Sequence, residues 1–78
     1  MPKFVLRSKS APDYFYKCKS GNEITFINEI EKAYFFITSV ENAQPYFDMN
    51  YTRLVRSLFE VYEIPEPKYV IRVVGTEL

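Results

Sequence analysis

Apolar and polar side chains alternate over two stretches near the start of the chain, residues 4–8 and 13–19. Alternation with a period of two is typical of β-strands that bury one face. Turn residues from Ser10 to Asp13 separate the two stretches, so the sequence predicts an antiparallel hairpin. The side chains that this hairpin is predicted to turn towards the core are Phe4, Leu6, Tyr14, Tyr16 and Cys18.

The middle of the chain predicts two further strands. Residues 23–27 alternate weakly, and residues 34–38 are aromatic and β-branched. Between them, Asn28 is placed to cap a helical turn over residues 29–32. The predicted sheet therefore gains two strands before the first helix of any length.

Two helices are predicted next. Thr38 and Glu41 have the spacing of a capping box, which indicates a helix that begins at Ser39. Proline inside a helix costs about 3 kcal/mol, so this helix is expected to end or kink at Pro45. Residues 51–62, capped by Asp48 or Asn50, predict a long amphipathic helix. Its apolar stripe consists of Tyr51, Leu54, Val55, Leu58, Phe59 and Tyr62.

The end of the chain predicts a stiff linker and a last strand. Pro65 and Pro67 stop the helix, and residues 68–74 alternate again, with Tyr69, Ile71 and Val73 towards the core. The sequence as a whole predicts one α+β domain over residues 1–78. Its sheet, mixed or antiparallel, has about four strands, and one long amphipathic helix and a short one pack on one face of it.

Composition and charge narrow the functional classes only slightly. The chain has 78 residues, is 47% hydrophobic and has no formal net charge, which gives no overall preference for nucleic acid or membranes. The first twenty residues carry five basic groups and one acid, and residues 21–50 carry five acids and one base. With a single cysteine, no apolar leader and no membrane-length apolar run, we expect a cytoplasmic protein.

The inventory of reactive side chains predicts a protein that is not an enzyme and binds no cofactor or metal. The chain has no histidine, one cysteine and two glycines, too few for a zinc site or a phosphate loop. Cys18 is expected to be a buried structural thiol on the core face of its strand. The seven tyrosines fit either of two positions, the edge of the core where it meets solvent or a protein–protein interface.

A binding face is predicted on the side of the sheet away from the helices. It mixes basic and apolar groups, whereas a solvated sheet face is usually more polar. An ordinary outer face, a protein interface and a platform for single-stranded nucleic acid all remain open. The predicted face consists of Val5, Arg7, Phe15, Lys17, Lys19, Val70, Arg72 and Val74.

One segment carries a resemblance to a known group. Residues 33–43 have the form A-x-x-F-x-T-x-x-E-x-A, preceded by the aromatic run at residues 14–17 and followed by the strand-like residues 69–73. This order resembles small uncharacterised proteins of bacteriophages and prophages. The resemblance implies a phage-related accessory protein that binds a host factor in a bacterial cell and has no active site.

Together these observations predict a small binding protein that acts through protein–protein contact, as a homodimer or on a host factor. The alternative is an accessory protein that binds nucleic acid through the basic sheet face. An enzyme is the third choice.

Overall fold

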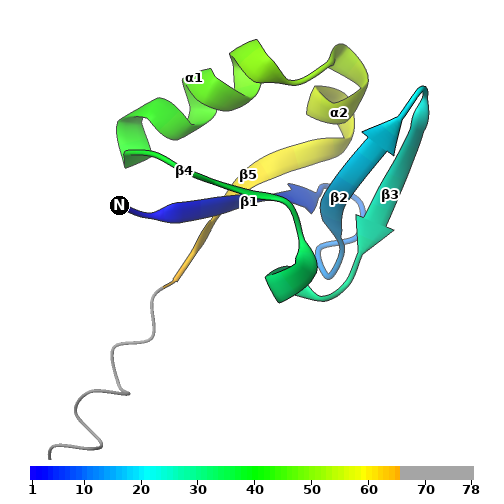
Figure 1. Ribbon diagram of the computed structural model, residues 1–78, viewed down its shortest axis with the longest axis horizontal. Helices are drawn as coiled ribbons and strands as arrows, with labels where there is room; N and C mark the ends of the chain where they lie inside the picture. Colours follow the sequence, from blue (N-terminus) through cyan, green and yellow to red (C-terminus); the bar gives the residue numbers. More distant parts are fainter. Residues whose placement is uncertain (66–78) are drawn as a thin grey trace, which may run out of the picture.

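The central element is β1 (Lys3–Ser8), the strand around which the antiparallel sheet is built (Figure 1). The computed structural model describes residues 1–65. β1 pairs along its whole length with β5 (Phe59–Ile64), from Lys3 opposite Ile64 to Ser8 opposite Phe59. Since a strand has only two edges, β4 (Phe35–Ile37) and β2 (Phe15–Ser20) share the other one. β3 (Glu23–Ile27) pairs with β2 beyond it.

Both helices cover one face of this sheet. α1 (Val40–Asn50) and α2 (Arg53–Leu58) lie above β1 and β5 in Figure 1. Even-numbered residues of β1 point towards them and are fully or almost fully buried. The resulting main core consists of Phe4, Leu6, Phe36, Ala43, Phe47, Val55 and Phe59. The prediction of an α+β domain with helices on one face is therefore confirmed, with five antiparallel strands in the described residues.

α1 begins after Ser39 as predicted, but the expected end at Pro45 is wrong. The helix continues through Pro45 to Asn50. Ala43 and Phe47, on either side of the proline, are both buried in the main core. Burying one large apolar side chain contributes about 1.5–3 kcal/mol, which offsets much of the cost of the proline.

The long helix predicted over residues 51–62 is wrong in its second half. α2 ends at Leu58, and Phe59–Ile64 form β5. Phe59, Val61 and Tyr62 suit a strand as well as a helix. Pairing with β1 decides between them, because it satisfies the backbone of both six-residue strands at once.

Capping also differs from the prediction. Neither Asp48 nor Asn50 caps α2. Instead, the hydroxyl of Thr52 accepts a hydrogen bond from the backbone N–H of Val55 at 3.4 Å. The helical turn expected after Asn28 is a 3₁₀ turn, η1 (Ile30–Lys32), and the residue at its N-cap is Glu29.

A β-bulge overturns the predicted face of Cys18. β2 and β3 pair with Tyr16 opposite Phe26 and Lys19 opposite Ile24, with a register shift between Tyr16 and Cys18. A bulge inserts one extra residue and so reverses the alternation beyond it. Tyr16 packs against the main core, whereas Cys18 is exposed. Tyr14, also predicted to face the core, is 43% exposed.

One predicted strand and six predicted face or core residues lie outside the described part of the chain. They are the strand over residues 68–74 and, within or beside it, the face and core residues Tyr69, Val70, Ile71, Arg72, Val73 and Val74. Among residues 1–65, no helix has the length and apolar character needed to cross a bilayer.

Candidate functional site

The sheet face opposite the helices carries a second apolar cluster. Val5, Phe15 and Ala33 are buried there, and half-buried apolar side chains pack against them, namely Ile27, Ile30, Tyr62 and Ile64. η1 and its neighbours cover the β2 end of this face, since Ala33 and Ile30 belong to the cluster. The β4 end is covered by no other element of the described residues.

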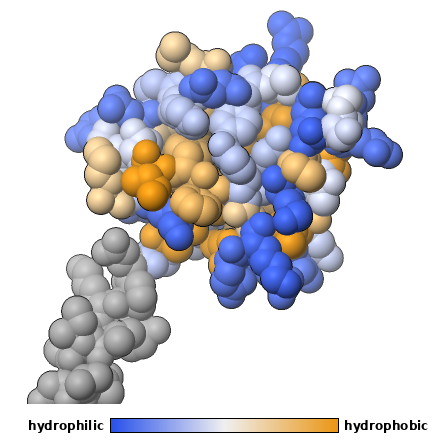
Figure 2. Space-filling model, viewed as in Figure 1, coloured by the Kyte–Doolittle hydropathy of each residue, from blue (hydrophilic) through white to orange (hydrophobic). Residues whose placement is uncertain are grey.

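The strand register defines what this uncovered end presents. Ile37, Lys3 and Ile64 lie in one row across β4, β1 and β5, and Phe35, Val5 and Tyr62 lie in the next. Phe35 is 46% exposed and Ile37 is 56% exposed. We call the surface over these six residues the open sheet face; Val5 is buried beneath it, and Phe35 and Ile37 are its most exposed apolar residues. In Figure 2, apolar side chains gather over the region of β4 and the start of α1, with hydrophilic side chains around them.

Two cations lie on aromatic rings of the same side of the sheet. The Lys3 ammonium is 4.4 Å from the centre of the Phe35 ring, and the Arg7 guanidinium is 4.5 Å from the centre of the Tyr62 ring. Arg7 also forms an ion pair with Glu60 at 2.9 Å. Both basic groups therefore have partners within the chain, and their alkyl stems cover apolar surface.

An acidic hollow of about 670 Å³ adjoins the open sheet face beside η1. Arg7 and Tyr62 reach it from the sheet, and Asp13, Glu29 and Glu31 line it from the loops. Lys3 lies at the other end of the sheet, where it pairs with Ile37 and Ile64. The face thus has a basic end and an acidic end.

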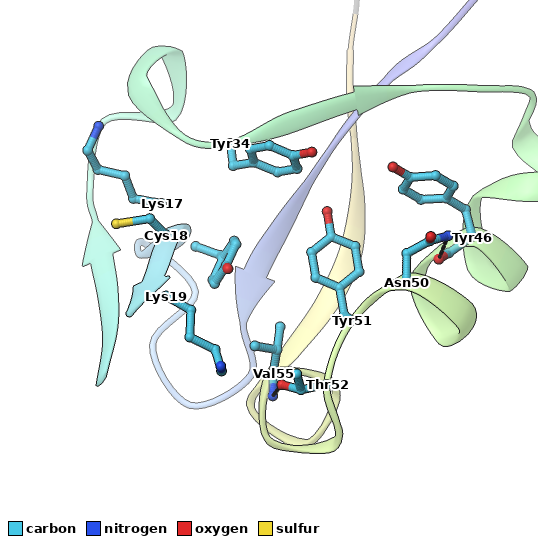
Figure 3. Close-up of a pocket in the computed structure, with 10 residues that line it drawn as sticks. Lys17, Cys18, Lys19, Tyr34, Tyr46, Asn50, Tyr51, Thr52 and Val55 are labelled. Atoms are coloured by element: carbon cyan, nitrogen blue, oxygen red, sulfur yellow. Dashed lines mark hydrogen bonds between the residues drawn. The ribbon is translucent and has the colours of Figure 1, made fainter. Parts of the chain in front are cut away.

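A second hollow lies on the other side of the molecule, between β2 and the junction of the two helices. It has a volume of about 540 Å³ and is lined by four tyrosines and two lysines, together with four other residues (Figure 3). We call it the tyrosine pocket. Its full lining is Tyr16, Lys17, Cys18, Lys19, Tyr34, Tyr46, Asn50, Tyr51, Thr52 and Val55.

Tyr51 packs against the other three tyrosines of the pocket. Its ring centre lies 6.0 Å from that of Tyr16 and 6.4 Å from those of Tyr34 and Tyr46, in edge-on arrangements. Its hydroxyl is buried and has no hydrogen-bond partner. Burial, with the neighbouring phenols of Tyr34 and Tyr46, raises the pKa of Tyr51 well above its usual range, so the hydroxyl stays protonated and can donate.

The predicted binding face is not one surface. Val5, Arg7 and Phe15 do lie together on the side opposite the helices, but Val5 and Phe15 are buried and cannot form an exposed apolar centre. Lys17 and Lys19 line the tyrosine pocket instead. The bulge in β2 is the physical reason, because it turns Lys19 to the side of Ile24.

Sequence reasoning missed the residues that form the exposed part of each surface. The helix prediction covers Tyr62 and ends before Ile64, although the aromatic and β-branched residues at 59–64 are also a strand signal. For the tyrosine pocket, the high number of tyrosines is the only signal that the sequence contains. No spacing in the sequence predicts that Tyr34, Tyr46 and Tyr51 meet.

Comparison with known proteins adds no assignment: no family model, no curated protein and no solved structure matches the chain. The resemblance to phage proteins therefore stays a prediction. Among the described residues, no group of three or more side chains has the composition of a metal site.

Proposed function

We propose that this chain is a non-enzymatic protein-interaction domain and that a second copy of the chain occupies the open sheet face. The observation that carries the proposal is the exposure of Phe35 and Ile37 on a sheet face that no other element of residues 1–65 covers. An antiparallel sheet with one face packed on helices usually presents polar side chains on the other. Here the side chains in two successive rows are apolar or aromatic except for Lys3.

The charge arrangement favours a copy of the same chain as the partner. Lys3 lies at one end of the face, and Asp13, Glu29 and Glu31 lie beyond the other. A two-fold axis that lies in the plane of the contact, perpendicular to the line joining the two ends, would place the basic end of each copy over the acidic end of the other. A two-fold contact of this kind uses the same patch twice, so a patch with opposite charges at its ends is self-complementary.

The size of the face sets the expected strength. Three strands spaced about 4.8 Å apart, of which β1 and β5 have six residues and β4 has three, present a footprint of at most about 14 by 20 Å. Stable complexes bury about 800 Å² on each partner, well above this footprint. We therefore expect weak self-association, with a dissociation constant of about 10⁻⁵ to 10⁻⁴ M.

Sedimentation velocity over a concentration series up to about 1 mM tests the proposal directly. Ile37→Glu places a charge within the proposed interface and should weaken association at least about tenfold, because a charge is costly to desolvate. Met49→Glu is the matched control, since Met49 is 82% exposed on α1, on the other face of the sheet. A wild-type chain that remains monomeric throughout would contradict self-association, as would equal effects of the two substitutions.

A further inference from the structure

The lining of the tyrosine pocket carries positive charge, whereas the chain as a whole has no net charge. Lys17 and Lys19 line it, and no carboxylate does. The acidic hollow on the other side has three carboxylates and one arginine in its lining. In a chain of zero net charge, the two hollows therefore have opposite preferences, and the tyrosine pocket favours an anion.

The polar groups of the pocket are arranged at two ends. Figure 3 shows the hydroxyls of Tyr34, Tyr46 and Tyr51 directed towards a common space beside β4 and the end of α1. Lys17 and Lys19 come from β2; the side chain of Lys19 extends towards Thr52 and Val55, whereas that of Lys17 points away from the tyrosines (Figure 3). Tyr16 lies between, with its ring 6.3 Å from Tyr34 and 6.0 Å from Tyr51. The pocket thus offers aromatic surface and hydrogen-bonding hydroxyls at one end and positive charge at the other.

We propose that the tyrosine pocket binds a nucleotide, with the base among the tyrosines and the phosphate at Lys19. Bases make favourable contacts with aromatic side chains and form hydrogen bonds through their edges. Phosphate is held by ammonium groups at close range. The volume of about 540 Å³ lies within the range of about 300–1,000 Å³ that is usual for small-molecule sites.

The hydroxyls of Tyr34 and Tyr46 favour a polar ligand over an apolar one. Both tyrosines line the pocket and are partly exposed, 46% for Tyr34 and 37% for Tyr46, so a ligand can reach them. The polar edge of a base can form hydrogen bonds with such hydroxyls. This inference is independent of self-association, because the pocket and the open sheet face share no residue.

Titration followed by ¹H–¹⁵N NMR, with the full chain, tests the proposal. The probes are adenosine monophosphate, adenosine, inorganic phosphate and a ten-residue single-stranded deoxyadenosine oligonucleotide. Saturable shifts of the pocket amides with the monophosphate are expected, and adenosine and phosphate alone should each bind at least about tenfold more weakly. If the oligonucleotide binds more tightly per site than the monophosphate, the ligand of the pocket is single-stranded nucleic acid. The reverse order indicates a free nucleotide.

Two variants and a control make the result specific. Lys19→Gln should weaken monophosphate binding about fivefold, and Lys9→Gln, which removes an exposed lysine outside the pocket, should leave it unchanged. Tyr34→Phe should weaken binding about fivefold by removing one accessible hydroxyl of the pocket. A purely structural hydroxyl would not change affinity in a folded variant. The proposal is overturned if the pocket amides do not shift, or if inorganic phosphate binds as tightly as the monophosphate.

Discussion

Phe59 is the residue whose environment differs most between the observed structure, in which it begins β5, and the predicted continuous helix over residues 51–62. Its side chain is completely buried, with ring centres 5.5 Å from Tyr16 and 5.1 Å from Phe26. Leu58, its neighbour, is 39% exposed at the end of α2. The helical stripe would bury both residues alike. Replacing each by alanine therefore distinguishes the two arrangements.

The expected losses follow from burial. Phe→Ala in a packed core costs about 3–5 kcal/mol, so we expect Phe59→Ala to cost about 4 kcal/mol. Leu→Ala removes three carbons at about 0.8 kcal/mol for each fully buried group, and roughly three-fifths of Leu58 is buried, which gives about 1.4 kcal/mol. The predicted difference between the two variants is about 2.5 kcal/mol. A domain of this size has a total stability of about 4–12 kcal/mol, so the difference is large on that scale.

Urea unfolding followed by far-UV circular dichroism measures both losses. With a slope of about 1 kcal/mol per molar urea, Phe59→Ala should lower the midpoint about 2.5 M further than Leu58→Ala. Phe59→Leu keeps most of the volume and should cost less than about 1.5 kcal/mol, so it provides a folded variant if the alanine variant does not fold. Equal losses for Leu58→Ala and Phe59→Ala would refute the end of α2 at Leu58.

Four further predictions follow from individual residues. Tyr51→Phe should raise stability by about 1 kcal/mol, because it removes an unpaired buried hydroxyl. Folding raises the pKa of Tyr51, so its contribution to the unfolding free energy should be constant below pH 10 and fall above it, and thermal melts above pH 10 should show a weaker fall in Tyr51→Phe. Native Cys18 should react with a thiol reagent within a few-fold of its rate in urea, and strong protection would contradict its exposure. A double-mutant cycle on Arg7 and Glu60 should give a coupling below about 1 kcal/mol that salt reduces, because both side chains are more than a third exposed.

The sequence alone determined the elements whose residue pattern fits only one type of secondary structure. Residues 4–8, 23–27 and 34–38 were predicted as strands and are strands to within a residue or two. The start of α1 at Ser39 was also predicted, although the Ser39 side chain makes no capping hydrogen bond. Period-two alternation and β-branched or aromatic residues are local signals, and no competing element could use them. The α+β class followed from these elements.

Tertiary structure decided the conformation of the segments whose residues fit two different types of local structure. Phe59 to Ile64 fits both a helical stripe and a strand, and only the free edge of β1 selects the strand. Pro45 stays inside α1 because Ala43 and Phe47 are buried on both sides of it. In each segment the free energy that decides comes from long-range pairing or burial, which local propensity does not contain.

The candidate binding surfaces depended still more on tertiary structure. The sequence placed Val5, Arg7 and Phe15 on a common face correctly, because alternation holds over short strands. It could not reveal the bulge in β2, which separates Lys17 and Lys19 from that face. Nor could it bring together Tyr16, Tyr34 and Tyr51, which come from β2, the start of β4 and the junction of the helices. Sequence patterns report which way a side chain points within its own element, whereas a pocket is formed by elements whose relative placement is fixed only when the core is packed.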